Sequence, residues 1–165
     1  MIQNHSIPSR LWFMSRGFKQ VPPELIDGKI LWAHPDGFFV NSKGQKVKHE
    51  FNRAMQKNEG GSKYPKMRYY GNKLCHHLMY VTFYGARTAG MEIDHINGDK
   101  LDYRPSNLEL VDPEENERRS RYLRVMRECD FDPRIFTADD FHHWFSLPFE
   151  EFKALFYHQK TTDHA

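Results

Sequence analysis

The chain contains little cysteine and no long apolar run. Cys75 and Cys129 are too few for a disulfide framework or a four-cysteine zinc site. No apolar run approaches the roughly 20 residues that are needed to span a bilayer. The first twenty residues lack the apolar core and cleavage site of a secretory signal, and no internal repeat is present. We therefore expect a cytoplasmic protein that does not contact a membrane.

The composition is that of a folded chain. Hydrophobic residues make up 39% and aromatic residues 15% of the sequence, which is enough apolar surface to offset the entropy lost on folding. A length of 165 residues fits one compact domain with room for an appended subdomain. We predict three regions: a strand-rich basic region at 1–73, a central core at 74–128 and an acidic helical region at 129–165.

The net charge of +2 conceals an uneven distribution. Residues 41–73 carry nine Lys and Arg against two Glu, a local charge of +7. Residues 128–165 carry three basic and eight acidic residues, a local charge of −5. Clustered cations with interleaved aromatics suit a polyanion, because each phosphate contact releases condensed counterions. The plain alternative is solvated surface charge.

Turn signals divide the first half of the chain into short elements. Strands are expected at 29–33 and 38–40, with a returning strand at 45–49. The sequence NEGGS at 58–62 predicts a flexible loop. Residues 74–84 repeat apolar side chains at helical intervals, and Gly85 follows where a helix would end.

Capping signals define the second half. Asp112 is a helix cap followed by Pro113 and two Glu, so a helix is expected to run to about residue 127. Thr137 begins a capping box for a second helix, and a third is expected from 148 to about 158. Aromatic residues recur at helical spacing in this acidic tail, which favours core packing over insertion into DNA. We expect a helical hairpin that packs on the central core or on a partner.

The stretch from Ile93 to Asn116 carries the chemistry. Asp94 and His95 are adjacent, and Asn107 and Asn116 follow Asp94 by thirteen and twenty-two positions. Carboxylate and amide oxygens are hard donors that suit Mg²⁺ or Mn²⁺. A neighbouring imidazole can take a proton from an attacking water, although adjacent strand residues cooperate in this way only if the strand bends. Asn107 can hold the intervening loop by bonding its backbone. We interpret the stretch as a metal-dependent nuclease centre.

This stretch resembles the HNH nuclease motif, the ββα-metal fold, in the form found in phage and intron-encoded homing endonucleases. The similarity covers about residues 74–119 and rests mainly on His76, 83–85, 94–98, Asn107 and Asn116. It implies one Mg²⁺ or Mn²⁺ ion per active site. By this resemblance, Asp94 and Asn116 are metal ligands, His95 is the general base and Asn107 is the structural asparagine of the motif.

We predict an α+β fold with a ββα-metal core, which the resemblance implies, a strand-rich N-terminal part and a C-terminal helical hairpin. A weaker similarity over 30–70 suggests a small sheet whose basic face lies along double-stranded DNA. The expected phosphate-contacting residues are Lys43, Lys46, Lys48, Lys66, Arg68, Lys73, Arg118, Arg119 and Arg121.

The leading hypothesis is an HNH endonuclease that hydrolyses DNA phosphodiester bonds, by nicking or double-strand cleavage. We expect a homing-type enzyme, encoded by a phage or mobile element and acting in the host cytoplasm. One alternative is a catalytically silent DNA-binding protein that retains the fold. Another is an RNA-directed or structural nucleic-acid partner. The sequence leaves open whether the chain acts as a monomer or a homodimer.

Overall fold

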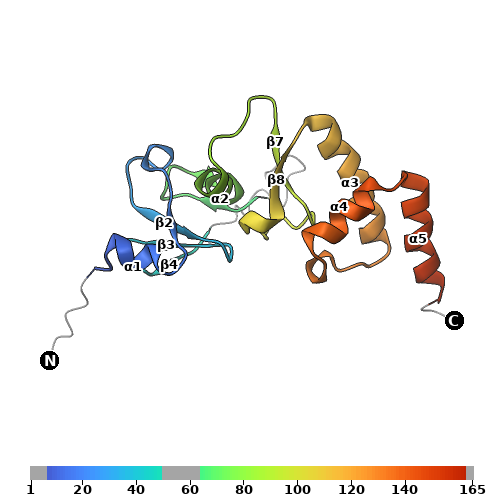
Figure 1. Cartoon of the computed structure of the whole chain (residues 1–165), viewed down its shortest axis with the longest axis horizontal. Coiled ribbons are helices and arrows are strands. Elements are labelled where there is room, and N and C mark those ends of the chain that lie inside the picture. Colours follow the sequence, from blue (N-terminus) through green and yellow to red (C-terminus); the bar gives the residue numbers. More distant parts are fainter. Residues whose placement is uncertain (1–6, 50–63, 163–165) are drawn as a thin grey trace. The chain divides into compact units, whose positions relative to one another are not determined.

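The computed structural model of the chain describes residues 7–49 and 64–162, with side chains described as far as His158. Helices and antiparallel strands both contribute to it, as predicted for the α+β class (Figure 1). None of the helices in these two ranges has the length and apolar character needed to cross a bilayer. The loop predicted at 58–62 lies outside the described residues.

The described chain divides into two compact units, and each unit is built from two separate segments. Unit 1 comprises the chain up to Ala86 together with Lys100–Leu108, and unit 2 comprises Arg87–Asp99 together with the chain from Glu109 onwards. These units do not coincide with the three regions expected from the sequence. The helix at 75–84 belongs with the N-terminal strands, and the C-terminal helices belong with the segment that contains Asp94.

Unit 1 contains a four-stranded antiparallel sheet in the order β1-β2-β3-β4. Its strands are β1 (Lys19–Gln20), β2 (Leu31–His34), β3 (Phe38–Asn41) and β4 (Lys46–Val47). Trp32 of β2 pairs with Val40 of β3, and both side chains pack with Phe13 of helix α1 (Arg10–Met14) in a small core. The Trp32 and Phe13 rings stack with centroids 4.5 Å apart. This core confirms the strands expected near residues 30 and 40.

The rest of unit 1 is a short hairpin followed by a helix. β5 (Lys66–Met67) pairs with β6 (Lys73–Leu74), and α2 (Cys75–Tyr84) begins directly afterwards. Leu78 and Met79 of α2 are fully buried. Gly85 ends the helix with a φ of 93°, a conformation that favours glycine because it has no Cβ. The helix predicted at 74–84 is therefore confirmed.

Unit 2 begins with the strand that carries Asp94 and His95. β7 (Glu92–His95) and β8 (Leu108–Val111) form a two-stranded sheet, and α3 (Pro113–Glu128) follows β8. The Asp112 side chain accepts a hydrogen bond of 2.8 Å from the Glu115 backbone N–H. This cap satisfies a backbone donor that has no partner within the helix, and it confirms the predicted helix start.

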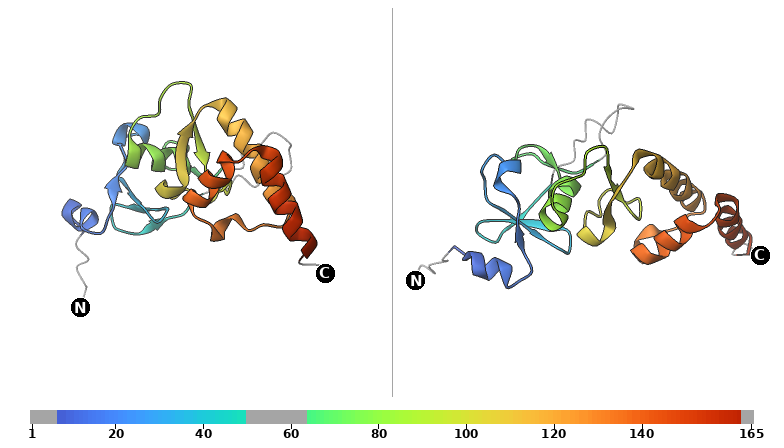
Figure 2. Two further views of the ribbon diagram at one scale, coloured as in Figure 1. Left: turned by 45° about the vertical axis from the view of Figure 1, so that its right-hand side comes forward. Right: turned by 45° about the horizontal axis from the view of Figure 1, so that its top comes forward.

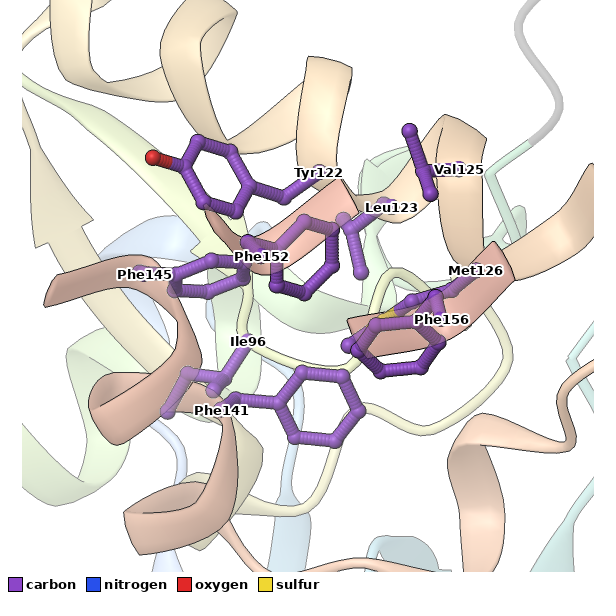
Figure 3. Close-up of a cluster of buried hydrophobic side chains, with 9 residues drawn as sticks. All are labelled: Ile96, Tyr122, Leu123, Val125, Met126, Phe141, Phe145, Phe152 and Phe156. Atoms are coloured by element: carbon purple, nitrogen blue, oxygen red, sulfur yellow. The ribbon is translucent and has the colours of Figure 1, made fainter. Parts of the chain in front are cut away.

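Two further helices complete unit 2. α4 (Ala138–Ser146) begins with the predicted capping box between Thr137 and Asp140, and α5 (Phe149–Thr162) follows. Both views of Figure 2 show α3, α4 and α5 grouped together. Their buried side chains form one aromatic-rich cluster with Ile96, which Figure 3 shows in close-up. Of the two places expected for the acidic helices, the central core or a partner, this cluster shows packing on α3 and Ile96 of the central core. Short 3-10 helices occupy Pro23–Leu25, Pro105–Asn107 and Pro133–Ile135.

Candidate active site

Strand β7 and the first turns of α3 face each other through two matched contacts. Glu92 and Asp94 are two residues apart on β7, so they share one face of the strand. Asn116 and Arg119 are three residues apart on α3, so they share one face of the helix. Asn116 Nδ2 donates a hydrogen bond to Glu92, and Arg119 Nη1 lies 3.7 Å from Asp94 Oδ2. These contacts bring the two expected metal ligands, Asp94 and Asn116, onto facing surfaces.

Burial destabilises the charged form of the Asp94 carboxylate. Its side chain is 13% exposed, and its Oδ2 atom is buried without a hydrogen bond from any described residue. Burial raises the pKa of Asp94 from 3.8 to about 6 because it penalises the charged form. The Arg119 guanidinium lowers this pKa in part, and the nearby Glu109 carboxylate raises it. Asp94 therefore has an oxygen whose charge the described protein neutralises incompletely.

Arg119 is the buried cation of this site. It is 9% exposed, and its guanidinium donates to Glu109 and, at 2.6 Å, to Glu115. The guanidinium carbon also lies 5.1 Å from the centre of the Phe145 ring. These contacts engage Arg119 inside unit 2, and its contact with a DNA phosphate stays a prediction. Arg119 holds the carboxylates around Asp94.

Arg118 is also engaged by the protein. It forms two hydrogen bonds to Glu115, of 2.6 and 2.8 Å, and donates to the Phe145 carbonyl at 2.7 Å. The bonds from Arg118 and Arg119 lower the pKa of Glu115 to about 2. Arg118 is bound to Glu115 in this conformation, and its contact with a phosphate stays a prediction. Arg121 is exposed on the same helix and stays a candidate.

Helix α4 contributes a histidine that sequence reasoning missed. His142 Nε2 lies 3.0 Å from Glu109 Oε1, the same oxygen that Arg119 binds. The two residues are 33 positions apart, so no local pattern could reveal the contact. Glu92 was also missed, although its position two residues before Asp94 on the strand is a signal that could have found it.

His95 ends strand β7, and its side chain is 3% exposed. The chain turns immediately after it, because the Gly98 N–H donates to the His95 carbonyl at 2.7 Å. Gly98 has a φ of 70°, and a Cβ there would lie 2.8 Å from Leu123. The positive φ favours glycine here, and an added Cβ would also displace the end of the Leu123 side chain, so this tight turn fixes where the strand ends.

Asn107 lies in unit 1, in the short helix before β8. It is buried, and its Nδ2 donates to the Asp102 carbonyl at 2.8 Å. An asparagine that bonds the backbone of the preceding loop has the geometry expected of a structural residue. A role in holding the loop therefore accounts for Asn107 without contact to the reacting groups.

The other basic side chains that are predicted to contact DNA phosphates belong to two hairpins of unit 1. Lys43, Lys46 and Lys48 lie in and beside the β3–β4 hairpin, and Lys66, Arg68 and Lys73 lie in the β5–β6 hairpin. All of them are exposed except Lys66, which is half-buried. Lys46 Nζ lies 4.3 Å from the centre of the Phe38 ring. Exposed cations beside aromatic rings are suited to phosphate contact.

The donors at Asp94 and Asn116 fit a hard divalent cation. The buried Oδ2 of Asp94 has no hydrogen-bond partner among the described residues, and the Arg119 guanidinium lies 3.7 Å from it. Asn116 uses its Nδ2 atom toward Glu92, and its amide oxygen takes no part in that bond. Within residues 7–49 and 64–162, no three His, Cys, Asp or Glu side chains form a metal-binding group. A carboxylate and an amide suit Mg²⁺, which keeps several waters when it binds.

A two-stranded sheet followed by a helix, with an Asp-His pair on the first strand and an Asn on the helix, has the element order of a ββα-metal nuclease unit. The chain matches a family model described as HNH endonuclease over residues 73–118. This part of the chain belongs to the HNH endonuclease family. No curated protein and no solved structure matches the chain.

Proposed function

We propose that this protein is a divalent-metal-dependent endonuclease that hydrolyses phosphodiester bonds in double-stranded DNA. The observation that carries the proposal is the matched pair of contacts between β7 and α3, Asn116 with Glu92 and Arg119 with Asp94. They lie within the segment that matches the HNH endonuclease family. Membership of that family supports a nucleic-acid substrate. The homing type and an origin in a phage or mobile element are part of the same proposal and rest on the resemblance of the motif.

Each polar residue has a distinct part in the proposed reaction. Asp94 and Asn116 would hold one Mg²⁺ or Mn²⁺ ion through their side-chain oxygens. When bound, such an ion stabilises the charge that develops on the leaving oxygen of the phosphate. His95 accepts a proton from the attacking water as general base. Asn107 acts at a distance by holding the loop between Asp102 and β8.

The electrostatics of Asp94 agree with this role. A carboxylate whose pKa is raised by burial gains more from a bound cation than a solvated carboxylate does, because the cation replaces hydration that the protein has removed. Arg119 compensates for part of this charge, but at 3.7 Å it does not saturate Oδ2. The site is therefore arranged to accept an additional positive charge.

Plasmid cleavage tests the proposal. Supercoiled plasmid incubated with the full chain and Mg²⁺ should give nicked or linear DNA, and EDTA should prevent this. His95→Ala should lower the rate by about 10²- to 10⁴-fold, the contribution typical of a general base. His143→Ala is the matched control, because His143 is exposed on α4.

The outcomes separate the candidate functions. Full activity of the His95→Ala variant would refute the assigned base. If the protein retards DNA in a gel but does not cleave it with any divalent ion, the alternative of a catalytically silent DNA-binding protein would be favoured instead. Cleavage of RNA in preference to DNA would refute the proposed substrate.

A further inference from the structure

Glu92 is an exposed residue of β7 whose carboxylate accepts a hydrogen bond from Asn116 Nδ2 on α3. An ionised carboxylate has no donor, so the Asn116 amide must present its nitrogen to Glu92 and not its oxygen. The two ends of an amide differ greatly toward a cation, because the oxygen is a ligand and the N–H groups repel positive charge. The contact therefore fixes which end of the Asn116 amide, the oxygen or the nitrogen, is free to face a cation.

The position of Glu92 connects this contact to Asp94. Glu92 and Asp94 share one face of β7, and Asn116 and Arg119 share one face of α3. With Nδ2 committed to Glu92, the hard donors on these facing surfaces are the Asn116 amide oxygen, the buried Asp94 Oδ2 and the Glu92 carboxylate itself. A rotation of the amide by half a turn would replace one of these donors with N–H groups.

We propose that Glu92 is a positioning residue for the metal site. It holds the Asn116 amide in the orientation that directs the side-chain oxygen to the ion, and it does not bind the ion itself. This inference rests on the proposed function, in which Asn116 is a metal ligand. Residues that orient metal ligands in this way commonly change metal affinity by about 10- to 100-fold when removed.

Two substitutions separate positioning from direct coordination. Glu92→Gln keeps an oxygen that can accept the Asn116 hydrogen bond but removes the charge, and Glu92→Ala removes both. The exposed Glu117, which follows Asn116 on α3, provides the control Glu117→Ala with the same change of charge. The measurement is the affinity of the full chain for Mn²⁺ by calorimetry without DNA, and thermal melting checks that each variant is folded.

We expect Glu92→Ala to weaken Mn²⁺ binding by about 10- to 100-fold, and Glu92→Gln and Glu117→Ala to stay within about threefold of the unchanged chain. An unchanged affinity in folded Glu92→Ala overturns the inference. Equal weakening by Glu92→Gln and Glu92→Ala also overturns it, because the charge would then matter more than the hydrogen bond.

A further variant separates this inference from the function on which it rests. If Asp94→Ala weakens Mn²⁺ binding and Glu92→Ala does not, Glu92 has no positioning role and the metal centre stands. If the unchanged chain binds no Mn²⁺, or binds it equally well after Asp94→Ala, the proposed metal centre is refuted together with the role of Glu92.

Discussion

Replacing Asp94 by Asn should make the protein more stable at neutral pH while removing its response to divalent metal. The substitution preserves the size of the side chain and removes the charge that burial disfavours. The pKa of Asp94 is raised from 3.8 to about 6, chiefly by burial. A difference of about two pH units, at about 1.4 kcal/mol for each, corresponds to about 3 kcal/mol.

Proton linkage determines whether the free energy of unfolding rises or falls with pH. A carboxyl group with a raised pKa favours the folded state when it is protonated, so its contribution is fully present below pH 3.8 and is lost as the pH rises through about 6. The free energy of unfolding of the unchanged chain should therefore fall across this range relative to Asp94→Asn. The variant should be more stable by about 0.5 kcal/mol at pH 4 and by about 3 kcal/mol above pH 7.

Urea denaturation followed by circular dichroism at several pH values measures this difference. Asp139→Asn is the control, because Asp139 is exposed in the first turn of α4. Mn²⁺ at about 100 times its dissociation constant should stabilise the unchanged chain by about 2.7 kcal/mol and leave Asp94→Asn unaffected. A stability difference that stays constant from pH 4 to pH 8 would refute the reasoning, as would equal stabilisation of both chains by Mn²⁺.

Two further predictions concern the basic residues. Affinity for DNA falls as the salt concentration rises. Neutralising three lysines of the unit 1 hairpins should make the slope of log affinity against log salt concentration less negative by about 2 to 3, and the control Lys153→Gln should leave it unchanged. The three lysines are Lys46, Lys48 and Lys66. An unaltered slope in the triple variant would move the interface elsewhere. Arg119→Leu should cost about 3–5 kcal/mol in urea denaturation because it removes the guanidinium that faces the buried Asp94 carboxylate and one partner each of Glu109 and Glu115. The exposed Arg121→Leu should change stability by less than about 0.5 kcal/mol. Equal effects would contradict the assignment of Arg119 as the buried cation.

Local signals in the sequence determined much of the secondary structure. The caps at Asp112 and Thr137 predicted the starts of α3 and α4, and Gly85 predicted the end of α2. Each of these signals acts within one turn of a helix, so neighbouring residues are sufficient to encode it. The residue types around Asp94, His95 and Asn116 likewise indicated a metal-dependent nuclease centre, and the resemblance to the HNH motif agrees with the family match over 73–118.

Tertiary structure decided which charged side chains face the solvent. Arg118, Arg119 and Arg121 are close together on one helix and look equivalent in the sequence. Contacts with residues outside the helix, namely Asp94, Glu109 and Phe145, surround Arg119, whereas Arg121 stays exposed. The compact units likewise depend on the return of 100–108 to unit 1, which no local pattern encodes. A helix cap needs only its own turn, whereas the environment of a charge depends on every element that packs around it.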